Sequence, residues 1–175
     1  LFVGKKVDPK APITLGDDEA AVVVVFRRSA DTGNQHGIMS FRRFDSGKGD
    51  LIFQPRDWKK KGDRTVYSTD IISADKTALY ELHLVRLTPG SYVIDFDGLG
   101  KINFGATNCF GAPMFTVKPG EIAYLTDIQP VNMKRADGTR VIEMGLVRDV
   151  SAARRGLAGF QPALAERLGE TALKN

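Results

Sequence analysis

The sequence predicts a mainly β protein, an antiparallel β-sandwich of about eight or nine strands with a short C-terminal helical segment. Three observations lead to this prediction. Apolar and polar residues alternate over several short runs, as they do on half-buried strands. Pro-Gly pairs and glycine clusters separate these runs. Apolar spacing becomes helical only after residue 150.

Composition indicates one globular domain. The chain has 175 residues, of which 42% are hydrophobic and 26% are charged. The net charge of +4 is scattered in short runs rather than gathered into a phosphate-binding face, so we do not predict nucleic-acid binding. One cysteine excludes an intramolecular disulfide framework. We divide the chain into an irregular lead-in (1–18), a β-sandwich domain (19–150) and C-terminal helices packed on the sandwich (151–175).

The first strands are predicted from residue type and alternation. Residues 20–26 are a continuous run rich in valine, which packs well on a pleated surface. Because this run does not alternate, we expect a central strand that is covered on both faces. Residues 38–44 alternate and predict a second strand, and a glycine-rich loop leads to a third at 51–54. A further short strand is expected near Val66 and Tyr67.

The clearest alternation lies between residues 80 and 148. Two turns, at 87–90 and 118–120, each contain Pro-Gly, in which proline fixes φ and glycine accepts a positive φ. Short strands are also expected at 101–104 and 115–117. We expect Ile128 to share a face with the inward residues before it. The residues predicted to be mainly buried are Leu82, Leu84, Tyr92, Ile94, Phe96, Ile122, Tyr124, Ile142, Met144 and Leu146.

The tail has helical signals. Ser151 is a suitable N-cap, Gly159 a stop, and Pro162 opens a second helix, where its missing N–H costs nothing. An apolar stripe is formed by Leu157, Phe160, Leu164 and Leu168. We expect this stripe to lie across a sheet edge or an open end of the sandwich.

The residues that support catalysis are few. His83 lies two residues after Glu81, so a strand would place both on one face. A metal site needs a third ligand, and none has a recognisable spacing. Cys109 lies in a glycine-bounded loop with no base nearby in sequence, and His36 lies in a turn.

Carboxylates give one further pattern. Asp95 and Asp97 share a face, which usually means polar residues facing solvent. Asp127 on a neighbouring strand would extend them to an acidic patch or a Ca²⁺ site. We assign no catalytic, metal-binding or cofactor-binding residue, and we predict that the protein is not an enzyme.

The segment from about residue 55 to 75 is the predicted partner-binding site. It has no clean period, and long irregular loops are usually functional or disordered. An aromatic side chain beside cations favours an interface anchor. The predicted site comprises Trp58, Lys59, Lys60, Lys61, Arg64 and Tyr67; a solvated loop is the alternative.

Two motifs carry a resemblance. Leu87-Thr-Pro-Gly-Ser-Tyr92 and Phe115-Thr-Val-Lys-Pro-Gly-Glu-Ile-Ala-Tyr-Leu125 are similar to the hairpins of transthyretin-like (prealbumin-like) β-sandwich domains of bacterial secreted proteins and lipoproteins. The match covers about residues 79–128. It implies a β-sandwich and an envelope location, and it supplies no catalytic residues.

We therefore expect a non-catalytic accessory or scaffold protein that binds another protein, such as a member of an envelope assembly. The expected location is the periplasm or the outer membrane. The first residue, Leu1, suits a mature secreted protein or a lipoprotein, in which a lipid anchor upstream of Leu1 would attach the chain to a membrane. It equally suits a chain that continues upstream as a disordered N-terminus. The rival interpretation is a carbohydrate- or ligand-binding module, and a hydrolase comes third because histidine and cysteine are scarce.

Overall fold

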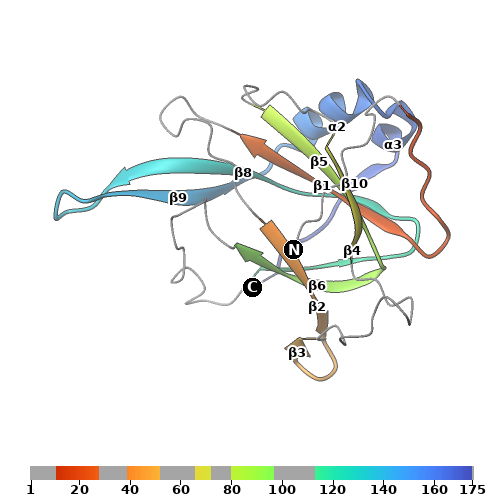
Figure 1. Cartoon of the computed structure of the whole chain (residues 1–175), viewed down its shortest axis with the longest axis horizontal. Helices are drawn as coiled ribbons and strands as arrows, with labels where there is room; N and C mark the ends of the chain where they lie inside the picture. The colour runs from red at the N-terminus through yellow and green to blue at the C-terminus, as the bar shows by residue number, and fades with distance from the viewer. Residues whose placement is uncertain (1–10, 28–38, 52–65, 72–79, 97–112, 175) are drawn as a thin grey trace.

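The computed structural model describes residues 11–27, 39–51, 66–71, 80–96 and 113–174 (Figure 1). This part of the chain is mainly β, as expected, and it contains two sheets. Its elements are β1 (Ala20–Arg27), β2 (Met39–Asp45), β3 (Asp50–Leu51), β4 (Val66–Ile71), β5 (Tyr80–Leu87), β6 (Gly90–Phe96), β7 (Met114–Val117), β8 (Ile122–Lys134), β9 (Arg140–Val147), α2 (Val150–Ala158), α3 (Pro162–Glu166) and β10 (Leu168–Glu170). The strand expected at 101–104, His36, Asp97 and Cys109 lie outside the described residues.

The larger sheet mixes parallel and antiparallel strands. Its order is β10-β8-β1-β5-β4, with β9 paired to β8, and the smaller sheet has the order β3-β2-β6-β7. β1 pairs with β8 in parallel, and so does β10. The expectation of a purely antiparallel architecture is therefore wrong. Tight hairpins force antiparallel pairing, but β1 and β8 are joined by a long stretch of chain that leaves both directions open.

β1 is central and covered on both faces, as its unbroken valine run predicts. Val22 and Val24 point to the smaller sheet, whereas Val23 and Val25 point to the helices. All four side chains are at most 1% exposed. The absence of alternation thus reflects burial on two sides rather than irregular structure.

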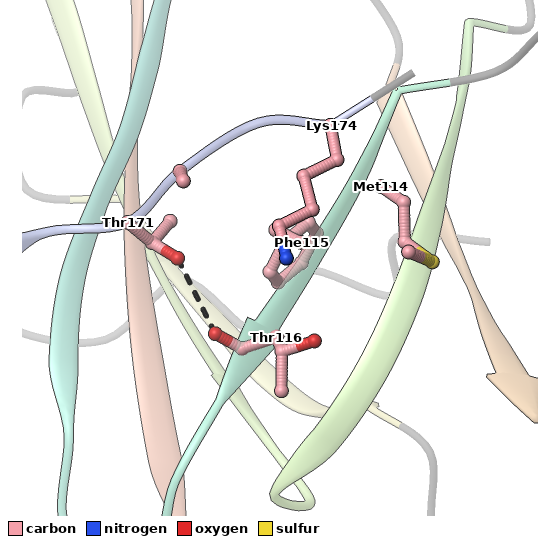
Figure 2. A pocket seen from close by; sticks show the side chains of 6 residues that line it. Met114, Phe115, Thr116, Thr171 and Lys174 are labelled. Carbon is pink, nitrogen blue, oxygen red and sulfur yellow. Dashed lines mark hydrogen bonds between the residues drawn. The ribbon is translucent and has the colours of Figure 1, made fainter. Parts of the chain in front are cut away.

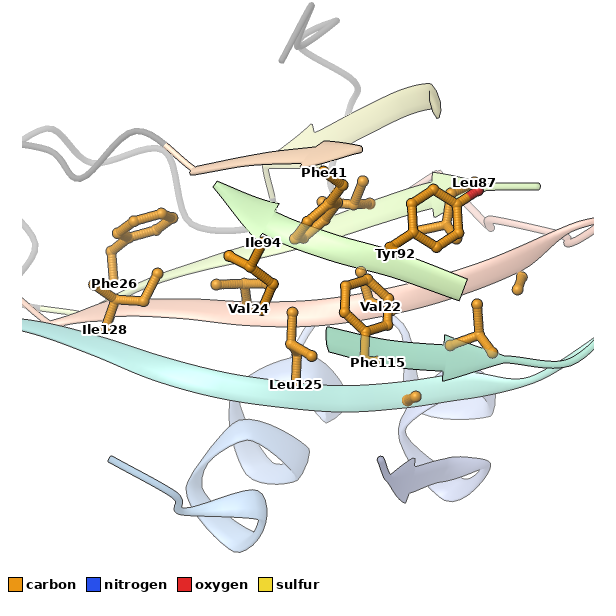
Figure 3. Packing of buried hydrophobic residues seen from close by; sticks show 14 residues of the cluster. Val22, Val24, Phe26, Phe41, Leu87, Tyr92, Ile94, Phe115, Leu125 and Ile128 are labelled. Carbon is orange, nitrogen blue, oxygen red and sulfur yellow. The ribbon is translucent and has the colours of Figure 1, made fainter. Parts of the chain in front are cut away.

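Side chains from both sheets share one hydrophobic cluster (Figure 3). The smaller sheet contributes Phe41, Tyr92, Ile94 and Phe115, which lie over Val22, Val24 and Leu125 of the larger sheet. Tyr92 and Phe115 stack at 5.5 Å between ring centroids, and Phe41 meets Phe115 edge to face at 5.2 Å. These aromatic contacts link β2, β6 and β7 to one another on the face of the smaller sheet that meets the larger sheet.

The C-terminal helices cover the opposite face of the larger sheet. Leu157 and Leu164 are buried against Leu84 and Tyr124 of that sheet, with Phe160 half-buried beside them. Leu168 is also buried, but it lies in β10, the edge strand of the same sheet. The helical part of the stripe therefore packs on a sheet face, whereas the expected position was an edge or an open end; Leu168 alone lies at the sheet edge, on a strand and not on a helix.

The helices can pack there because β5 is apolar on both faces: Leu82 and Leu84 face the helices, and Val85 and Leu87 face the smaller sheet. The alternation read from residues 80–87 indicated one apolar face only.

The ends of the helices are partly as predicted. Pro162 begins α3, and Gly159 caps α2 at its C-terminus. The N-cap of α2 is Asp149, not Ser151, because the Asp149 carboxylate accepts the Ala152 backbone N–H at 2.9 Å. Ser151 lies inside the first turn and is exposed.

The two Pro-Gly turns are corners between sheets, not hairpins. β5 belongs to the larger sheet and β6 to the smaller, and β7 and β8 are divided in the same way. Gly120 has φ 72°, a conformation that favours glycine. At the other corner, the buried Tyr92 hydroxyl donates to the Thr88 carbonyl. The turns were predicted correctly, but local sequence does not show which sheet the next strand joins.

A β-bulge in β8 reverses the faces of the residues that follow it. The register with β1 shifts between Val23 and Val24, so that Leu125 has no partner there. Ile122 and Tyr124 face the helices, whereas Ile128 faces the smaller sheet. The prediction that these residues share one face is therefore wrong, because a bulge changes the period of two by one residue.

Most of the predicted core that can be assessed is confirmed. Six residues are at most 2% exposed: Leu82, Leu84, Tyr92, Ile94, Ile122 and Tyr124. Leu146 was predicted to be buried and is 41% exposed, because it lies on β9, which among the described strands pairs only with β8. The side chains of Phe96, Ile142 and Met144 lie outside the described residues.

Candidate protein-docking site

β8 and β9 form a long antiparallel hairpin that extends well beyond both sheets (Figure 1). It runs from the pair Asp127–Val147 at its base to the pair Lys134–Arg140 near its tip. We call this hairpin, residues 127–147, the arm. Its outer part leaves the described body of the molecule, and the residues from 131 to 140 are all exposed within the described structure.

The arm gathers the exposed apolar side chains of the described structure. Within the described residues, every large hydrophobic side chain that is exposed lies on it: Val131 (40%), Met133 (46%), Leu146 (41%) and Val147 (39%). Single exposed apolar residues are ordinary, but a group of them on one element indicates an interaction surface. This concentration makes the arm the candidate docking site.

Pairing defines two faces of the arm. Val131, Met133, Val141 and Val147 share one face with Gln129, Glu143 and Gly145, since directly paired residues and alternate residues point the same way. We call the first four of these residues the apolar face. Lys134 and Arg140 lie directly opposite each other on the other face, which also carries the exposed Leu146.

The tip of the arm is a closed turn. Arg135 N–H donates to the Thr139 carbonyl at 2.9 Å, and Gly138 N–H donates back to the Arg135 carbonyl at 2.9 Å. The Asp137 carboxylate accepts the Thr139 N–H at 2.8 Å, and this bond lowers the pKa of Asp137. Gly138 has φ 86°, which suits a glycine. A hairpin closed in this way needs little further ordering when it binds.

A buried polar cluster fixes the base of the arm. The bulge turns Asp127 toward the helices, where its side chain is fully buried and binds Arg27 at 2.6 Å. The Tyr124 hydroxyl donates to Asp127 at 2.8 Å and accepts the Asp149 N–H at 2.8 Å. Thr126 donates to the Val147 carbonyl at 3.2 Å. Both strands of the arm are thus tied to β1 and to the start of α2.

The pKa values in this cluster reflect burial. Burial raises the pKa of Asp127, against the lowering effect of Tyr124 and Arg27. Burial, with a smaller contribution from Asp127, raises the pKa of Tyr80 to about 12, and burial also raises the pKa of Tyr124. Perturbed pKa values can mark a catalytic site. Here the Asp127 carboxylate is fully buried and engaged by Arg27 and Tyr124, so the cluster is best explained as an anchor.

The predicted partner-binding residues are only partly placed. Trp58, Lys59, Lys60, Lys61 and Arg64 lie outside the described residues. Tyr67 lies in β4, within the short strand expected there, but its side chain is not described. The structure therefore leaves this segment as a prediction.

The other candidate groups are resolved more clearly. His83 Nε2 lies 2.7 Å from Glu81 Oε1, as their shared face suggested, and the His83 ring meets Phe26 edge to face at 4.9 Å. Within the described residues, no group of three or more metal-ligating side chains comes together. The acidic patch proposed for Asp127 is wrong, because Arg27 binds its carboxylate on the helix-covered face.

A small groove lies between β7 and the C-terminal segment (Figure 2). It is lined by Met114, Phe115, Thr116, Thr171, Ala172 and Lys174, and Thr171 donates across it to the Thr116 carbonyl at 3.3 Å. Its volume of about 200 Å³ is below the roughly 300–1,000 Å³ of common ligand pockets. It therefore adds little support to a ligand-binding role.

The sequence holds a signal for the arm, although no hairpin was predicted there. Asp137-Gly138 between two extended runs is a strong hairpin signal. The sequence does not show that the hairpin projects from the rest of the protein. Val131 and Met133 alternate with polar residues in the way that buried strand residues do.

Comparison with protein-family models, curated proteins and solved structures found no match to this chain. The resemblance to transthyretin-like domains accordingly remains an expectation. In the described part of the chain, none of the helices has the length and hydrophobicity required to cross a bilayer.

Proposed function

We propose that this chain is a non-catalytic accessory or scaffold protein that binds another protein through the arm. The observation that carries the proposal is the gathering of exposed apolar side chains on one projecting element. Burying Val131 and Met133 in a partner would recover the roughly 25 cal/mol per Å² that apolar area yields on leaving water. The closed tip and the fixed base keep the ordering cost of binding low.

Two finer proposals accompany it. We propose that the two sheets form a β-sandwich, which is supported by the hydrophobic cluster they share. We also propose a cell-envelope location, which is supported by the motifs at 87–92 and 115–125 alone.

The docking proposal is tested by photo-crosslinking in the native source. A photoreactive amino acid replaces Met133 on the apolar face in one variant and the exposed Asp18 in a control. We expect the variant at position 133 to form a discrete adduct with one protein and the variant at position 18 to form none. Equal adduct patterns from both positions would show that the arm is not the docking site. A third variant at Trp58 tests the segment predicted from sequence.

A further inference from the structure

We propose that the partner is an acidic protein segment, one that places carboxylates at the arm tip and apolar side chains along the apolar face. This inference rests on the proposed function and specifies the chemistry of its partner. Three observations support it. The tip carries exposed cations, two of these cations face each other across the paired strands, and the exposed apolar residues lie behind the tip along the strands.

The tip holds three exposed cations: Lys134, Arg135 and Arg140. Within the described residues, none of them pairs with a carboxylate. The acidic residue within the tip is Asp137, whose carboxylate accepts the Thr139 backbone N–H in the turn. The tip therefore carries a net charge of +2, from three cations and one carboxylate.

The arrangement of two of these cations is unfavourable in the free protein. Lys134 and Arg140 are direct partners across the antiparallel pair. Like charges placed directly opposite each other on a sheet destabilise the pairing. A carboxylate positioned between the two would relieve this repulsion and bind both cations.

A second copy of the chain is a poor occupant. An arm-to-arm dimer with parallel arms would match the apolar faces but bring two tips of like positive charge together. One with antiparallel arms would set each tip against the base of the other arm, where the Asp127 carboxylate is buried and bound by Arg27.

A membrane surface is also a poor match to the arm. Residues 135–140 at the tip are polar or small, and the exposed apolar residues lie behind them along the strands. An inserting hairpin would need its apolar side chains at the tip, whereas a protein groove would cover the strands from the side.

A selection experiment identifies the chemistry of the partner before the partner itself is isolated. A random linear peptide library is selected on the wild-type protein and counter-selected on the Val131→Thr/Met133→Thr variant. We expect the retained peptides to be enriched in Asp and Glu next to apolar residues. Their affinity should fall with rising salt, and Lys134→Ser/Arg140→Ser should weaken it about tenfold or more. The matched variant Lys134→Arg/Arg140→Lys keeps the charge and should retain binding.

The outcomes separate the two proposals. Peptides that depend on the arm but are neutral or basic would overturn this inference and leave the docking function standing. If no retained peptide depends on the arm for binding, both the docking function and the acidic-partner inference are refuted. Binding to phosphatidylserine vesicles that is lost in Met133→Thr would replace the protein partner by a membrane and thus refute the inference. Circular dichroism of each variant verifies that the fold is retained, and removal of the like-charge pair should not lower stability.

Discussion

At the scale of single residues, the neighbouring bulge determines on which face of the sheet the Asp127 side chain lies. The bulge at Leu125 places it on the helix-covered face, where Arg27, Tyr124 and Asp149 gather around it. Without the bulge, the carboxylate would point into the apolar cluster between the sheets. The polar cluster around Asp127 thus ties the direction of the arm to the position of α2.

Asp127→Ala should destabilise the protein by about 2–3 kcal/mol, because it leaves the Arg27 guanidinium and the Tyr124 hydroxyl without their acceptor. This is less than the roughly 3–5 kcal/mol lost when a fully buried ion pair is broken, since the Arg27 side chain is 30% exposed and can still reach water. Urea denaturation measures the loss. The exposed Asp18→Ala is the control and should change stability by less than about 0.5 kcal/mol. Equal effects of the two variants would show that the cluster does not anchor the fold.

The raised pKa of Tyr80 leads us to predict that the protein loses stability at alkaline pH. The folded-state pKa of Tyr80, raised by burial, is about 12, against an ordinary value of 10.0. The folded protein therefore holds the proton more tightly than the unfolded chain does. The resulting stability is fully present below about pH 10 and is lost as pH rises toward 12. Denaturation at several alkaline pH values should show a shallower decline for Tyr80→Phe; an unchanged decline would contradict this assignment.

Residue-level prediction from sequence succeeded where alternation was regular. Leu82, Leu84, Tyr92 and Ile94 were correctly assigned as buried because period two fixes which side chains share a face. It failed at Ile128, where a bulge changed the period, and at Leu146, where the strand was correct but nothing covers its outer edge among the described strands. Bulges and coverage depend on the neighbouring strands, and a single sequence does not display them.

At the scale of elements, the connections decide the architecture. The corner at 87–90 and the corner at 118–120 each move the chain from one sheet to the other. The strands on both sides were predictable, and the change of sheet was not, because the same turn residues serve a hairpin equally well. In the tail, Gly159 and Pro162 correctly marked the end of α2 and the start of α3, but the sequence did not show which sheet face the helices would cover.

The start of α2 offers a direct comparison of two assignments. Asp149→Ala should cost about 1 kcal/mol, because it removes the acceptor of the Ala152 N–H. Ser151→Ala, at the position favoured by sequence, should change stability by less than about 0.5 kcal/mol. Chemical denaturation of both variants measures the difference. A larger cost for Ser151→Ala would mean that the helix begins where the sequence pattern placed it.

At the scale of the whole molecule, the described structure has a body of two sheets and two helices, with one projecting part. The smaller sheet, the larger sheet and the two helices bury two hydrophobic clusters. The arm extends from this body and carries the exposed apolar residues. Composition could not predict the candidate site, because valine, methionine and leucine are ordinary strand residues. What distinguishes those on the arm is that the fold leaves their side chains exposed.

The central claim is that the arm binds a partner and contributes little to the body, and shortening the arm tests it most directly. In the shortened chain, residues 131–143 are replaced by Asn-Gly, which closes a two-residue turn between the paired Pro130 and Met144. The measurement is the amount of the protein crosslinked at position 133 that the shortened chain retains in a pull-down, compared with wild type. We predict that the shortened chain folds, with an almost unchanged thermal midpoint, and retains none of that protein. Retention equal to wild type by the folded, shortened chain would contradict the claim.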